Sequence, residues 1–130
     1  MYHAIRLTEN QDLKQEIIKY SKEHNIAAGA VLSGVGCAKK IHIRLAKAIN
    51  YIEEEKDYEI VSLMGTISKD DVHLHISLSD ENGVTIGGHL KDGTIINSTC
   101  EIVILELPNY EFTREFDEHT GYNELVIRGK

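Results

Sequence analysis

The chain is poor in cysteine and has no long apolar segment. Cys37 and Cys100 are its only cysteines, and they do not form a C-x-x-C pair. Both thiols are therefore expected to be reduced and buried. No apolar run approaches the roughly 20 residues of a membrane span, and residues 1–6 lack a signal-peptide profile. These absences predict no membrane association and a cytoplasmic location.

Positive charge is also scarce. The sequence has 14 Lys and Arg against 21 Asp and Glu, which gives a net charge of −7 and a pI near 5.4. Its one local concentration of basic residues is diluted by apolar neighbours, and we interpret it as the solvated side of a strand: Lys39, Lys40, Arg44 and Lys47. Because neutralising phosphates requires clustered Lys and Arg, DNA binding is not expected to be the main task.

The length and the periodic segments predict a single α+β domain over residues 1–130. A hydrophobic content of 42% is enough for a real core. One helix is indicated by apolar residues at helical spacing, namely Leu13, Ile17 and Tyr20. Thr8 or Asn10 is the expected cap, and His24-Asn25 marks the exit.

The remaining segments favour a mostly antiparallel sheet beside that one main helix. Strand-like composition or alternation is found in five segments: Ile26–Val35, Lys40–Lys47, Tyr58–Ser68 (with Gly65 as a bulge), Val72–Ser79 and Ser98–Leu107. Turns are predicted at residues 53–57, a charged run, and at Asp92-Gly93. Residues 110–130 are too apolar for a disordered tail, so they should fold back onto the domain.

Residues 72–90 predict a β-hairpin with a defined register. Apolar residues alternate with polar ones from Val72 to Ser79, as in a half-buried strand. Asn82-Gly83 is a strong turn signal, but it allows more than one loop length. A three-residue loop with Gly83 in the left-handed conformation keeps the apolar residues on one face and sets His75 opposite His89. A two-residue loop would put His89 on the apolar face instead.

This register brings His73, His75 and His89 close enough to share one cation. Opposed residues have Cβ atoms roughly 5 Å apart, and same-face neighbours along a strand lie about 7 Å apart. Three neutral imidazoles with an open position form a catalytic-type zinc shell, so a divalent metal, zinc first, is the predicted cofactor. Its affinity is expected to fall below about pH 6 as the imidazoles protonate. The alternative is that these are ordinary polar-face histidines.

A small-ligand space is predicted beside the three histidines. Ser77 lies opposite Gly87 on the same face, and with Gly88 these residues are the candidate ligand-binding positions. His3 and His119, near the ends of the chain, are candidates for an additional metal ligand from a neighbouring subunit.

The order of segments resembles the plant-and-prokaryote-conserved (PPC) domain. The resemblance is carried by Glu59–Ile67, by the H-L-H-x-S-L of His73–Leu78, and by Gly83 with the G-G-H-L of Gly87–Leu90; weaker support comes from Ala30–Gly36, Thr99–Val103 and Arg114, Asp117 and Thr120–Tyr122. It implies a compact α+β fold, a homotrimer and a metal site at the three histidines. Members are often labelled DNA-binding by analogy with plant relatives, in which an Arg-Gly-Arg-Pro hook contacts DNA. This chain has no such hook, since its single proline is Pro108.

Three functions from different classes remain open on the sequence. The first is a homotrimeric, non-catalytic module that binds a metal ion or a small molecule. The second is a DNA-associated regulator, in which trimerisation supplies avidity. The third is a metal-dependent enzyme, for which Glu59 or Glu101 is the candidate general acid/base.

Overall fold

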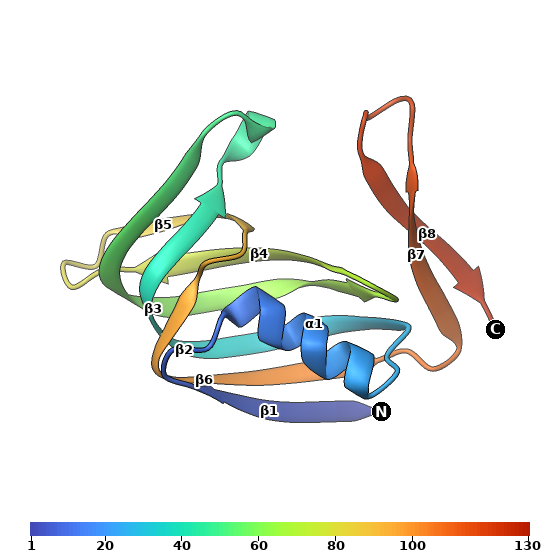
Figure 1. Ribbon diagram of the computed structural model, residues 1–130, viewed down its shortest axis with the longest axis horizontal. Helices are drawn as coiled ribbons and strands as arrows, with labels where there is room; N and C mark the ends of the chain where they lie inside the picture. Colours follow the sequence, from blue (N-terminus) through green and yellow to red (C-terminus); the bar gives the residue numbers. More distant parts are fainter.

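The computed structural model describes residues 1–130 as one sheet, one helix and a separate hairpin (Figure 1). The six-stranded sheet is antiparallel and has the order β1-β6-β2-β3-β4-β5. Its strands are β1 (Tyr2–Thr8), β2 (Ala28–Arg44), β3 (Tyr51–Ser68), β4 (Val72–Ser79), β5 (Thr85–Leu90) and β6 (Ile95–Glu106). The other elements are α1 (Leu13–Glu23), a 3₁₀ turn η1 (Ala46–Ala48), and the hairpin of β7 (Tyr110–Phe116) and β8 (Asn123–Gly129). The α+β class and the antiparallel sheet are as predicted.

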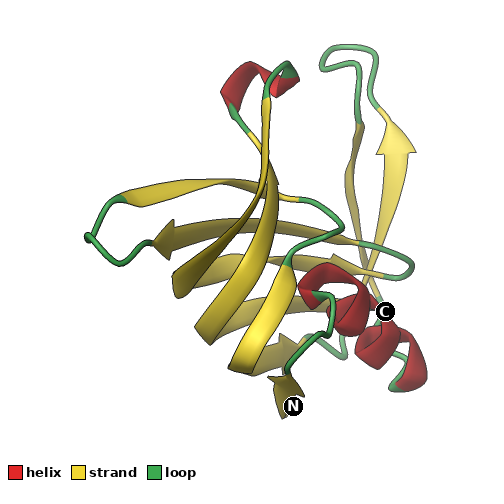
Figure 2. Ribbon diagram, turned by 60° about the vertical axis from the view of Figure 1, so that its left-hand side comes forward, coloured by secondary structure: helices red, strands yellow, loops and turns green.

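The sheet curls so that its far edge returns to one of its central strands. β2 and β3 are 17 and 18 residues long, and both bend and run on toward η1, as Figure 2 shows. The last residues of β2 pair with β5, Ile43 with Leu90 and Arg44 with His89. Strands β2 to β5 therefore enclose a ring, and the end of β5 lies where that ring closes.

The core fills the space between the helix and one face of the sheet. Leu13 and Ile17 of α1 are fully buried and join one cluster with residues from β2, β3, β4 and β6. The cluster includes Leu74, Ile76, Leu78 and Leu90, the predicted apolar face of the 72–90 hairpin. No helix in the structure is both long enough and apolar enough to cross a membrane.

The helix begins with a different cap from the one predicted. Asp12 is the N-cap, and its side chain accepts hydrogen bonds from the amides of Gln15, at 3.1 Å, and Gly93, at 2.8 Å. Asn10 has a φ of 74°, whereas an N-cap residue adopts an extended backbone. The exit is as predicted, with His24 at the C-cap.

Two predictions within β3 are wrong. Residues 53–57 are not a turn but part of this strand, paired with the last residues of β2. The register shift against β4 falls between Ile60 and Ser62, not at Gly65. Gly65 instead has a φ of 154°, and a Cβ there would lie 1.9 Å from the carbonyl oxygen of His73. Glycine is needed at this position because the two main chains approach so closely.

The C-terminal segment folds, and its base packs on the domain. Phe112 is buried and exchanges main-chain hydrogen bonds with Ala27 and Lys69. The rest of the β7–β8 hairpin projects away from the sheet (Figure 1), and several of its apolar side chains stay exposed: Phe116, Tyr122 and Ile127.

Candidate metal centre

The hairpin of β4 and β5 has the predicted register. The amide of Asp80 donates to the carbonyl of Val84 at 3.0 Å, and Gly83 has a φ of 79°. His75 lies opposite His89, Ser77 opposite Gly87, and Leu78 opposite Ile86. Alternation along β4 then places His73 and His75 together on the face that points away from the core.

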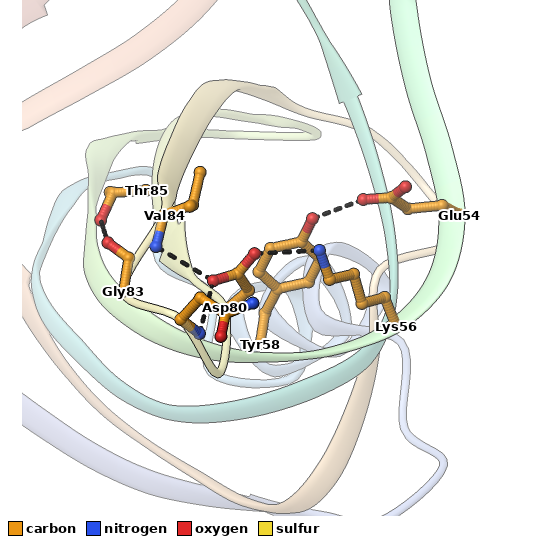
Figure 3. A network of polar contacts seen from close by, with 8 residues as sticks. Glu54, Lys56, Tyr58, Asp80, Gly83, Val84 and Thr85 are labelled. Carbon is orange, nitrogen blue, oxygen red and sulfur yellow. Dashed lines mark hydrogen bonds and ion pairs between the residues drawn. The ribbon is translucent and has the colours of Figure 1, made fainter.

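Asp80 holds the turn of this hairpin in place. Its carboxylate accepts from the amides of Asn82, at 2.9 Å, and Val84, at 3.0 Å, and forms an ion pair of 2.9 Å with Lys56 of β3 (Figure 3). Tyr58 donates a hydrogen bond to Glu54 beside this pair. The hydrogen bond from Lys56 and those from the two amides lower the pKa of Asp80. The turn, and with it the register, is therefore fixed by polar contacts at the end opposite the histidines.

The three imidazoles form a compact triangle. The ring centroid of His73 lies 5.1 Å from the centroid of His75 and 5.1 Å from that of His89. The centroids of His75 and His89 are 5.8 Å apart. One nitrogen from each ring lies within 4.8 Å of the others. In tetrahedral zinc sites ligand nitrogens are about 3.3 Å apart, so side-chain adjustments of about 1 Å would let all three nitrogens bind one ion, with the fourth position open.

These rings have no hydrogen bonds, unlike the rings of three other histidines of the chain. His3 bonds to Tyr20 and Glu106, while His24 and His42 bond to main-chain carbonyls. No ring nitrogen of the triangle has a protein partner, and the buried Nδ1 of His89 is unsatisfied. An unpaired buried polar atom costs free energy, which a metal ion or a bound ligand would recover. The residues present therefore fit a metal ion.

The surroundings keep two of the rings neutral. Burial and the nearby guanidinium of Arg44 lower the pKa of His89 to about 4. Burial and the guanidinium of Arg114 lower the pKa of His73. Neutral imidazole is the form that coordinates metal, so both rings are in their ligating state at neutral pH.

The triangle separates two hollows of different character. The first, of about 910 Å³, contains apolar side chains and the candidate ligand positions Ser77, Gly87 and Gly88. A Cβ on Gly87 would lie 2.7 Å from the carbonyl oxygen of Ile76, so the lack of a side chain here allows close main-chain packing. The second, of about 880 Å³, is lined by charged side chains from both ends of the chain. His73, His89 and Arg44 line both hollows.

Other candidate residues are not brought to the triangle. Glu59 pairs with Ser79, four residues along β4 from His75, and Glu101 lies on β6, with β2 and β3 between it and β4. His3 is engaged with Tyr20 and Glu106, and His119 lies in the exposed turn between β7 and β8.

Arg44 and Arg114 are site residues that the sequence interpretation missed. Arg44 was assigned to a solvated strand side, yet its Nε is buried and it lies directly opposite His89. Arg114 reaches the site from β7 and donates to Thr66, the residue opposite His73. No spacing pattern signals either contact, because both arise from long-range folding.

Comparison with known proteins identifies the family. A model of the Plants and Prokaryotes Conserved (PCC) domain matches residues 1–108. The chain belongs to this family, the PPC domain that the sequence resembles. Two curated relatives, each a bifunctional protein GlmU from a Synechococcus strain, are 40% and 41% identical over 126 residues. The alignments include 97% and 96% of this PCC domain, which spans only a fifth of the relatives' length.

Solved structures share the fold of this PCC domain throughout. A hypothetical protein from Salmonella cholerae-suis has a TM-score of 0.96 at 29% identity, covering 100% of this chain and 94% of that one. A metal-containing protein from Archaeoglobus fulgidus has a TM-score of 0.79 at 28% identity, covering 97% and 93%. A candidate DNA-binding protein from Bacteroides thetaiotaomicron has a TM-score of 0.86 at 22% identity, covering 96% and 91%.

Proposed function

We propose that this PCC domain is a non-catalytic binding module that holds a divalent metal ion, zinc by its ligand chemistry, between His73, His75 and His89. The observation that carries the proposal is the triangle of imidazoles without hydrogen bonds on one rigid hairpin. Imidazole nitrogen suits zinc and its neighbours in the transition series. The metal-containing relative from Archaeoglobus fulgidus adds support.

The positions of Glu59 and Glu101 favour binding over catalysis. A metal-dependent hydrolytic enzyme needs a group that moves protons within hydrogen-bond reach of the metal-bound water or the substrate. Neither Glu59 nor Glu101 is near the triangle. The two candidate general acid/bases are therefore out of reach of the triangle, and we propose that the module binds its ligand without transforming it.

A homotrimer is the assembly that we propose for the module. Four large apolar side chains are exposed on the sheet face opposite the core: Leu32, Val35, Val61 and Met64. The β2–β3 ladder pairs Val31 with Gly65 and Gly36 with Ile60, so all four side chains lie between the same two rungs and form one patch. Met64 also lies opposite His75, which places the patch next to the metal centre. An apolar patch of this kind is typical of a subunit contact.

A DNA-associated role is the second candidate. Six basic side chains line the charged hollow and favour this role. The description of the Bacteroides relative also favours it. The net charge of −7 and the concave shape of that hollow favour a small molecule instead. In the GlmU relatives, the matching segment would be an accessory binding module of a larger protein.

Metal analysis of untagged protein tests the metal site. Protein loaded with excess zinc and desalted at pH 7.5 should retain about one ion per chain, whereas His75→Ala should lose it together with any zinc-dependent thermal stabilisation. His24→Ala and His42→Ala, whose rings bond elsewhere, should behave like the wild type. A wild type that carries no more zinc than His75→Ala contradicts the proposal.

Light scattering tests the assembly. A trimer of the 14.6 kDa chain has three times that mass, and Val61→Glu should reduce the mass by placing charge in the apolar patch. A wild type of monomer mass at micromolar concentration counts against the trimer.

A further inference from the structure

The charged hollow beside the triangle is positive in a negative protein. Six basic side chains line it, with only three carboxylates: Lys14, Arg44, Lys47, Lys69, Lys91 and Arg114, against Asp70, Asp71 and Glu124. Nearly half of the chain's 14 Lys and Arg therefore surround one hollow of about 880 Å³. A concave site lined by one sign of charge concentrates ligands of the opposite sign.

None of these six cations is in an ion pair. The ion pairs of the structure engage other basic residues, on other surfaces: His3, Lys39, His42, Lys56 and Arg128. The Nε of Arg44 is buried without any partner, and Arg114 bonds only to the Thr66 hydroxyl, at 3.3 Å. Guanidinium groups that are left free in a hollow are available to an incoming acceptor.

The two arginines lie on different sides of the imidazoles. Arg44 is paired with His89 at the junction of β2 and β5. Arg114 reaches Thr66 from β7, and Thr66 lies opposite His73. Each guanidinium is close enough to lower the pKa of its neighbouring histidine. A metal ion held by three neutral histidines would therefore sit beside two further positive charges, with no carboxylate among its ligands.

We propose that the centre takes a small molecule through a carboxylate or phosphate group, which binds the metal ion and the guanidinium groups of Arg44 and Arg114 together. This inference rests on the proposed metal site and names the class of its ligand. Both oxyanions accept two parallel hydrogen bonds from a guanidinium, and both bind zinc through oxygen. The ligand offsets positive charge that the protein leaves unbalanced.

Metal and oxyanion should strengthen each other's binding. The free metal site is opposed by the two guanidinium charges, and the oxyanion removes that opposition. Coupling between two ligands is reciprocal, so the anion must raise metal affinity by the same factor by which the metal raises anion affinity. A factor of about ten or more is expected for charges in direct contact.

Cobalt(II)-loaded protein provides the test, because its visible spectrum reports on the ligands of the ion. Untagged protein is loaded with cobalt and titrated with inorganic phosphate and, separately, succinate, at constant ionic strength set with chloride. At least one of these should give a saturable spectral change that chloride does not give. Calorimetry should show at least tenfold weaker binding of that anion to the metal-free protein.

Arginine variants locate the anion. Arg114→Gln should retain cobalt and weaken the anion about tenfold or more, as expected for the loss of a charge-assisted hydrogen bond. Arg44→Gln should act in the same direction. Arg128→Gln is the matched control: it lies on β8 of the same hairpin as Arg114, outside the hollow, and should leave anion affinity unchanged.

The outcomes separate the two proposals. Three results would each overturn the oxyanion assignment and leave the metal site standing. The first is retained cobalt with no saturable response to either anion. The second is equal anion affinity with and without metal, and the third is equal behaviour of Arg114→Gln and Arg128→Gln. Loss of cobalt from the wild type defeats the metal site itself. Displacement of the anion by micromolar duplex DNA, dependent on Arg114, would refute the small-molecule ligand in favour of nucleic acid.

Discussion

Acid should release the metal ion less steeply than three ordinary histidines would allow. When the pH is lowered from 7.5 to 5.0, protons compete with the metal ion for the imidazole nitrogens. The ring of His89, with its pKa held at about 4 by burial and by Arg44, stays mostly neutral throughout this range. A depressed pKa means weaker proton competition, so His89 contributes little to the loss.

The size of the effect follows from the proton-binding terms. At pH 5, an imidazole with the free pKa of about 6.5 has about 30 protonated rings for each neutral one. Three such rings would together lower the metal affinity by about 10⁴-fold. With one ring at about 4, at most two rings compete, and the loss is about 10³-fold. Because burial and Arg114 also lower the pKa of His73, the measured loss should be smaller still.

Equilibrium dialysis against buffered zinc, with metal measured at several pH values from 7.5 to 5.0, gives this loss directly. Arg44→Gln should raise the pKa of His89 and steepen the dependence. A wild-type loss of 10⁴-fold or more, or a slope approaching three protons per ion near pH 5.5, would show that the positive surroundings do not act on His89 as described.

Three further predictions concern the hairpin that carries the site. Gly87→Val should lower the melting temperature and the zinc content, since its Cβ would lie 2.7 Å from a main-chain oxygen of the neighbouring strand, whereas Gly129→Val, with open space around it, should change neither. Leu78→Ala, at a fully buried position, should cost about 2–5 kcal/mol of unfolding free energy in urea, against much less for Val84→Ala on the exposed turn. Asp80→Asn should flatten the pH dependence of stability. Because the folded-state pKa of Asp80 is lowered, its ionised carboxylate stabilises the fold above the unfolded pKa, and this contribution is lost as pH falls through the folded pKa. The difference between the urea midpoints at pH 7 and pH 3 should therefore be smaller in the variant than in the wild type.

The hairpin was predictable because its rules are local. Alternation along residues 72–79 fixes which side chains face the core, and a turn with Gly83 in the left-handed region links the two strands. A shift of one residue would have moved His89 into the core, so the apolar pattern alone selected the register.

The charged run at residues 53–57 was misread for a physical reason. This part of β3 is exposed and needs no apolar alternation. Its carboxylates are matched instead by basic residues across the strand pair, Glu55 by Lys40 and Glu53 by His42, the latter with a contact of 3.2 Å. Opposite charges on facing strands stabilise a sheet even where one strand is exposed. Sequence patterns that look for buried faces cannot detect such a segment.

The cations of the site were beyond local reasoning. Arg44 precedes His89 by 45 residues, and the two meet only because the sheet curls until β2 contacts β5. Arg114 arrives through the placement of a hairpin whose base is anchored by Phe112. The three histidines lie in one segment and could be brought together from its pattern, whereas the charge around them depends on the whole fold.

The junction of β2 and β5 joins the strands through only two residue pairs. Short seams at the end of a ladder are where a sheet opens first, long before global unfolding. Opening this one would move His89 away from Arg44 and leave the ladder with β4 as the only strand pairing of β5. A bound ion would tie β5 to β4, since one of its ligands lies on β5 and two on β4, and would so hold His89 in the position from which β5 pairs with β2. Amide hydrogen exchange at residues 88–90 would therefore slow on metal binding, while the amides of β1 and β6 would exchange as before.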